Sequence, residues 1–222
     1  MAHRQEEKEQ RKRERLEREA AAAAEAKRKR MLQIVGGVVV AAAVVIGLVL
    51  ALTGGGGDED RPADDAVTTA ARAANCTYKT FPEEGNAHVA DKRTKADYKT
   101  NPPTSGDHNP TAAQDGLYQS GNEPALENWV HTLEHGRIIL MYKPGTPPPA
   151  VTSMDNLFKE PVLDSGASYH MVLMRNNTQM PFQAAAVAWR RYVGCPTVTP
   201  AALEAMRTFR DRWVDKGPEF IP

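Results

Sequence analysis

The chain has 222 residues, of which 41% are hydrophobic and 25% charged, and its 28 basic side chains balance its 28 acidic ones. The balance comes from two opposite parts, because residues 1–30 carry an excess of Lys and Arg whereas residues 54–222 carry an excess of Asp and Glu. Glu residues interleaved through the basic tail weaken its positive field, so the composition argues against a nucleic-acid-binding protein.

Residues 34–52 are an unbroken apolar run without a single polar side chain. As a helix, such a run is about 28 Å long, close to the ~30 Å hydrocarbon thickness of a bilayer. The basic flank precedes it and Gly and Asp residues follow it, which places the N-terminus in the cytoplasm. A cleaved signal peptide normally has an apolar core of only about 7–15 residues. The sequence therefore predicts a charged cytoplasmic tail (residues 1–30) and a single-pass signal anchor in the cell membrane (residues 31–53), with the lipid bilayer as partner.

Behind the anchor, residues 54–74 are rich in Gly and Asp and are interpreted as a flexible linker. Residues 75–222 contain all the aromatic side chains and have an ordinary size for one extracytoplasmic domain. Both cysteines, Cys76 and Cys195, lie in this domain. In an oxidising compartment such a pair is most simply a disulfide, and redox catalysis is disfavoured because there is no C-x-x-C motif.

Hydrophobic periodicity predicts an α/β domain. The expected elements are a helix from Pro124 to just before Gly136, strands at 137–143, 169–175 and 184–193, and helices at 150–160 and 200–215. These give a small sheet of three to four strands covered by helices. Residues 76–121 are rich in Pro, Gly, Asn and Asp and are expected to form long ordered loops before it.

Four of the six histidines fall between residues 88 and 135: His88, His108, His131 and His135. His131 and His135 are four residues apart on the first predicted helix and project almost opposite its apolar face. Either they face water, or the Pro-rich loop of residues 101–110 folds over them and brings His108 alongside. Three or four neutral imidazoles suit zinc or copper.

The same helix spells His-x-x-Glu-His, the motif of inverted zinc peptidases, in which Glu134 would be the general base. A third ligand is then needed downstream, and Glu204 lies 69 residues beyond His135 on the last predicted helix. The domain is small for that fold, and Gly136 ends the helix directly after the motif. A nucleophilic pair of Ser105 and His108 is a weaker interpretation, since no acid or oxyanion hole accompanies it.

Several segments together resemble the bacterial, membrane-anchored family called domain of unknown function 3105. They are His88-Val89, residues 98–110 (YKTNPPTSGDHNP), residues 116–118 (GLY), residues 130–136 (VHTLEHG) and Ala188-Trp189. The resemblance implies the layout of tail, anchor and domain, and it includes His88, His108, His131, Glu134, His135 and Gly136. Asp115 stands where many members carry a cysteine, so no thiolate ligand is expected there. The family implies no reaction.

Two hypotheses follow for the function. The first is a metal-binding extracytoplasmic domain, with zinc or copper held by the four histidines and Glu134 behind them, fixing an imidazole tautomer. The alternative is a structural or interaction module of the cell envelope, without metal, in which the histidines pin the Pro-rich loop and the domain contacts other envelope proteins. A zinc-dependent hydrolase using the His-x-x-Glu-His motif is less favoured than either.

Overall fold

The computed structural model describes residues 61–219 and 221. The predicted tail of residues 1–30 and the predicted anchor of residues 31–53 lie outside this part of the chain. Among the described residues, no helix has the length and apolar character that crossing a bilayer requires.

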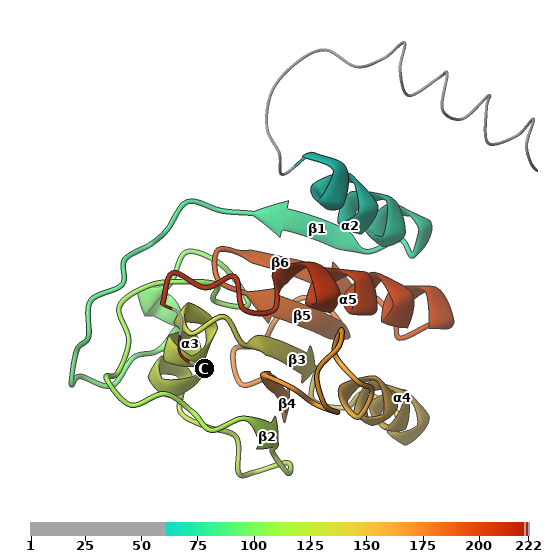
Figure 1. Cartoon of the computed structure of the whole chain (residues 1–222). Helices are drawn as coiled ribbons and strands as arrows, with labels where there is room; N and C mark the ends of the chain where they lie inside the picture. Colours follow the sequence, from blue (N-terminus) through green and yellow to red (C-terminus); the bar gives the residue numbers. More distant parts are fainter. Residues whose placement is uncertain (1–60, 220, 222) are drawn as a thin grey trace, which may run out of the picture. The chain divides into compact units, whose positions relative to one another are not determined.

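The domain is built on one mixed sheet of six strands in the order β1-β6-β5-β3-β4-β2 (Figure 1). The strands are β1 (Thr77–Thr80), β2 (Gly116–Leu117), β3 (Ile138–Tyr142), β4 (Met171–Arg175), β5 (Ala184–Ala188) and β6 (Arg191–Cys195). β4 runs parallel to both β3 and β2, and the other neighbours are antiparallel. The α/β class is confirmed, but the expected three to four strands are too few.

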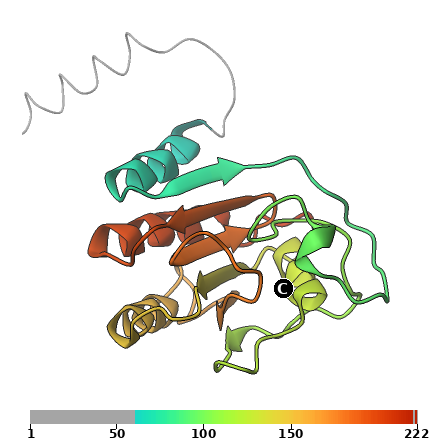
Figure 2. The same ribbon diagram turned by 180° about the vertical axis from the view of Figure 1, so that it is seen from behind.

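Helices cover both faces of this sheet. Helices α2 (Arg61–Ala73), α4 (Pro148–Phe158) and α5 (Pro200–Trp213) pack on one face, and α3 (Leu126–Glu134) packs on the other (Figures 1 and 2). The apolar run of β3 serves both layers, because Ile138 and Leu140 join the core under α4 and α5 while Ile139 and Met141 join the core under α3. This explains why β3 is continuously hydrophobic instead of alternating.

The structure corrects two boundaries drawn from the sequence. The single strand expected at 184–193 is a hairpin, in which Trp189 and Arg190 form the turn between β5 and β6. Residues 61–73, part of the expected linker, form helix α2, and its Val67 and Ala71 are buried in the core. The linker interpretation of residues 54–74 is therefore too long at its C-terminal end.

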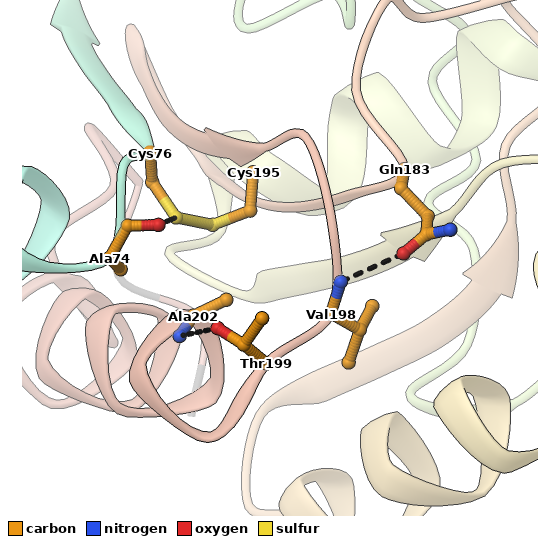
Figure 3. Close-up of a disulfide and its surroundings, with 7 residues drawn as sticks. All are labelled: Ala74, Cys76, Gln183, Cys195, Val198, Thr199 and Ala202. Carbon is orange, nitrogen blue, oxygen red and sulfur yellow. Dashed lines mark hydrogen bonds between the residues drawn. A yellow bond between two sulfur atoms is a disulfide. The ribbon is translucent and has the colours of Figure 1, made fainter.

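The expected disulfide between Cys76 and Cys195 is confirmed (Figure 3). Cys76 precedes β1 and Cys195 ends β6, and the antiparallel register that pairs Thr77 with Gly194 brings the two cysteines together with Cα atoms 4.3 Å apart. Figure 3 also shows the start of α5, where the Thr199 hydroxyl accepts a hydrogen bond from the backbone N–H of Ala202, as its position predicts.

Candidate metal centre

Helix α3 carries the centre of the candidate site and is buried on nearly all sides. Its apolar residues face the sheet, as expected, yet His131 and Glu134 are also buried, with 4% and 2% exposure. The Pro-rich loop produces this burial. Backbone N–H groups of Asn109 and Ala113 donate to carbonyl oxygens of α3, at 3.2 and 3.1 Å. Of the two sequence alternatives, the loop folding over the helix is the one that the structure shows.

The loop preceding His108 is held by contacts with Glu84, a residue of an earlier segment. The Glu84 carboxylate accepts hydrogen bonds from the backbone N–H groups of Lys99 and Thr100, at 2.5 and 3.0 Å. Ser105 is fully buried, and its hydroxyl accepts a hydrogen bond from the Glu84 backbone N–H. Ser105 is therefore part of the loop scaffold, which argues against its proposed role as a nucleophile.

His88 and His108 are joined through the backbone. A parallel bridge connects them, with the His108 N–H donating to the Ala87 carbonyl at 3.0 Å and the Val89 N–H donating to the His108 carbonyl at 2.7 Å. Their rings lie 5.0 Å apart, and each lies 4.7 Å from the ring of His131. Two separate loop segments thus deliver imidazoles to one point on α3.

Four potential ligand atoms converge at this point. Those of His88, His108, His131 and Glu134 all lie within 4.8 Å of one another, and we call these residues the inner group. Glu134 Oε2 is 2.9 Å from His108 Nε2 and 3.6 Å from His88 Nε2. The sequence placed Glu134 behind the ligands, whereas its carboxylate lies among them.

Backbone carbonyls fix the tautomers of two of these rings. His108 Nδ1 lies 2.7 Å from the Gly106 carbonyl oxygen, and His131 Nδ1 lies 2.6 Å from that of Asn109. Because a carbonyl only accepts, both Nδ1 atoms carry the proton, and in a neutral ring Nε2 then presents a lone pair. Burial lowers the pKa of His108 and of His131, which favours the neutral rings.

The inner group contains two buried polar atoms without a hydrogen bond, His108 Nε2 and Glu134 Oε2. They face each other at 2.9 Å although both are acceptors when the ring is neutral and the carboxylate ionised. Burial raises the pKa of Glu134, and the nearby Glu219 raises it further. Unsatisfied buried groups are rare and call for a partner. A cation between the two lone pairs would satisfy both.

His135 lies at the border of the inner group. Its Nε2 is 2.8 Å from His131 Nε2 and 3.5 Å from Glu219 Oε2. His131, His135 and Glu219 form a second set of potential ligands, the outer group, which shares His131 with the inner one. No sequence pattern points to Glu219, because it follows the last helix in an irregular segment without a motif. All four predicted histidines therefore gather at the site, and one acidic residue joins them unexpectedly.

The third ligand proposed for an inverted zinc peptidase does not join them. Glu204 lies on α5, on the other face of the sheet, where it is exposed and paired with Arg207. It belongs to neither group of potential ligands among the described residues.

A family model described as "Protein of unknown function (DUF3105)" matches residues 88–219, more than half of the chain. The chain belongs to this family. The resemblance carried by the histidine segments is thereby confirmed. In this DUF3105 chain the matched segment begins at His88 and ends at Glu219, so it contains every member of the inner and outer groups. Comparison with curated proteins and with solved structures gives no significant match.

Proposed function

We propose that the domain binds a divalent transition-metal ion, with zinc as the best fit, through His88, His108, His131 and Glu134. The observation that supports this most strongly is the buried, unsatisfied pair of His108 Nε2 and Glu134 Oε2. Around a tetrahedral zinc ion with bonds of about 2.0–2.2 Å, ligand atoms lie about 3.3–3.6 Å apart. The separations of Glu134 Oε2 from the two imidazoles, 2.9 and 3.6 Å, need only small adjustments to meet this spacing.

The surroundings of the ligands support the same proposal. In metal sites a ligating histidine normally donates its second ring N–H to a carbonyl or carboxylate. His108 and His131 both have such a carbonyl partner at Nδ1. Imidazole and carboxylate donors suit zinc and also copper(II), whereas the absence of a thiolate among these donors disfavours copper(I).

We further propose that this domain is displayed outside the cell by the signal anchor. The support is the apolar run of residues 34–52 with its basic N-terminal flank. The disulfide between Cys76 and Cys195 agrees with an oxidising compartment.

The alternative is a structural or interaction module without metal. It draws support from the same hydrogen bonds, because the His131 ring on α3 binds the Asn109 carbonyl of the Pro-rich loop and the His108 ring binds the Gly106 carbonyl within that loop. The two functions make opposite predictions for a variant that lacks one imidazole.

Zinc binding by the purified full chain, in a mild detergent and after metal removal, tests the proposal. Competition with a chromophoric chelator should show one tightly bound equivalent in the wild type and none in His108→Ala. His3→Ala, which removes a histidine of the N-terminal tail, is the matched control and should bind like the wild type. A wild-type chain that binds neither zinc nor copper, with His108→Ala markedly less stable, would instead support the structural module.

A further inference from the structure

We propose that the C-terminal segment formed by residues 215–219 and Ile221 is a strap that closes the metal centre and supplies Glu219 as a further carboxylate ligand. The inference rests on the proposed metal binding and extends it, because it assigns a role to a segment far from the histidine motifs. A bound divalent ion and the strap would then hold each other in place.

The strap reaches α3 from the opposite face of the sheet. After α5 the chain runs across to the end of α3, visible as the red segment of Figure 1. Its backbone is joined there at two points, since the Asp215 N–H donates to the Gly136 carbonyl at 2.9 Å and the Glu219 N–H donates to the Glu134 carbonyl at 3.1 Å. The guanidinium of Arg137 bonds both the His135 and Ile221 carbonyls, which ties the far end of the strap to the same place.

Two glycines allow this close approach. Gly136 has φ +78°, and a Cβ on it would lie 2.8 Å from the Cα of Asp215. A Cβ on Gly217 would collide with the Glu134 carbonyl oxygen. The strap is therefore packed directly against the backbone of the residue whose carboxylate belongs to the inner group.

The Glu219 side chain extends from the strap toward the histidines. Its Oε2 lies 3.5 Å from His135 Nε2, and its carboxylate lies within 4.8 Å of the ligand atoms of both His131 and His135. With 46% of its side chain exposed, it has room to move while its backbone is held. Glu219 thus has a fixed backbone position and a side chain that can adjust.

His131 joins the two groups into one centre. Its Nδ1 is engaged with the Asn109 carbonyl, so Nε2, which lies 2.8 Å from His135 Nε2, is the nitrogen that would bind an ion. Glu134 and Glu219, with 3% and 46% of their side chains exposed, would both be available to an ion held by that nitrogen. Zinc commonly accepts carboxylate oxygens beside imidazoles. The outer group is accordingly the lid of the inner site and not a second site.

Glu219→Gln in the full chain tests this role, with Glu204→Gln as the matched control, because Glu204 is an exposed carboxylate on the other face of the sheet. Glu219→Gln should weaken zinc binding by at least about tenfold, the range for disturbing a residue that supports or completes a metal site. Glu204→Gln should leave the affinity unchanged. Gly217→Ala, which keeps the carboxylate but displaces the strap, should also weaken binding.

A second measurement follows the strap itself. Lys216 is exposed and precedes Gly217, so trypsin can release residues 217–222, detected by mass spectrometry. Zinc should slow this release in the wild type and in Glu204→Gln but not in Glu219→Gln. If Glu219→Gln binds zinc as tightly as the wild type, and zinc still slows the tryptic release of its residues 217–222, the proposed role of the strap is wrong. The proposed inner site would be unaffected by that result. If the wild type binds no zinc at all, the proposed function fails and the strap with it.

Discussion

Glu134→Gln should be more stable than the wild type in the absence of metal and less stable than the wild type when zinc is bound. In the wild type the carboxylate is almost fully buried and faces the lone pair of His108 at 2.9 Å. Burial, followed by the repulsion of Glu219, raises its pKa. A carboxyl whose pKa is raised on folding costs stability increasingly as pH rises from its unfolded pKa through its folded one, so the penalty grows toward high pH.

The glutamine has no such penalty, and its amide can donate a hydrogen bond to His108 Nε2. One net buried hydrogen bond contributes about 1 kcal/mol, so without metal the variant should be more stable than the wild type by at least that amount. For a domain of this size this corresponds to a rise in Tm of about 2–4 °C.

Zinc should favour the wild type instead. At a zinc concentration a hundredfold above its Kd, the wild type gains about 2.7 kcal/mol. Glu134 is a direct ligand in the proposal, so its loss should weaken affinity at least tenfold, which leaves Glu134→Gln with a gain of at most about 1.4 kcal/mol at the same concentration. Thermal unfolding followed by circular dichroism, with chelator and then with zinc, measures both differences. The reasoning is refuted if the metal-free variant is less stable than the wild type, or if zinc raises the Tm of both proteins equally.

Three further predictions concern pH, the disulfide and topology. Because burial lowers the pKa of His108, His131 and His135, zinc affinity should stay level around neutral pH and fall only below about pH 6.5, as protons displace the ion; a fall that begins above pH 7 in a titration of Kd against pH would contradict this. Changing both Cys76 and Cys195 to serine opens a loop with a sequence separation of 119 and should cost about 5 kcal/mol in the chain-entropy model, lowering the Tm by about 10–20 °C; two titratable thiols in the native unreduced protein would show the pair to be open. Protease added to intact protoplasts should remove the domain and spare the N-terminal tail, and protection of the domain would reverse the proposed orientation.

The sequence predicted those features that depend on local periodicity and failed where distant contacts decide. Helices α3 and α5 follow from their apolar spacing, and strand β3 follows from a short continuous apolar run that ends at Pro144. The β5–β6 turn has no Gly, Asn or Pro, and Arg190 adopts φ +65° there. Its conformation is held from outside, because the Arg190 N–H donates to the Thr104 carbonyl and the Phe81 N–H donates to the Arg190 carbonyl. No local sequence pattern predicts these long-range contacts.

The candidate site shows the same division. The helical spacing and the stiffness of the Pro-rich loop were enough to associate His108 with His131 and His135. The direction of the Glu134 carboxylate depends on where α3 ends and on where the loop places His108. The sequence alone therefore could not predict that this carboxylate lies among the ligand atoms. The place of Glu219 beside the histidines depends on the backbone hydrogen bonds that join the strap to the end of α3, and no sequence pattern predicts these.

The covalent bond between β1 and β6 has a mechanical consequence. Any tension applied through the N-terminal end of the domain first reaches α2, which lies before Cys76 in the chain. α2 can be peeled from α5, but unravelling stops at Cys76, because the disulfide passes the load to the end of β6. The pull therefore bypasses β1 and enters the sheet at the end of β6, two strands away from β3, which follows α3 in the chain.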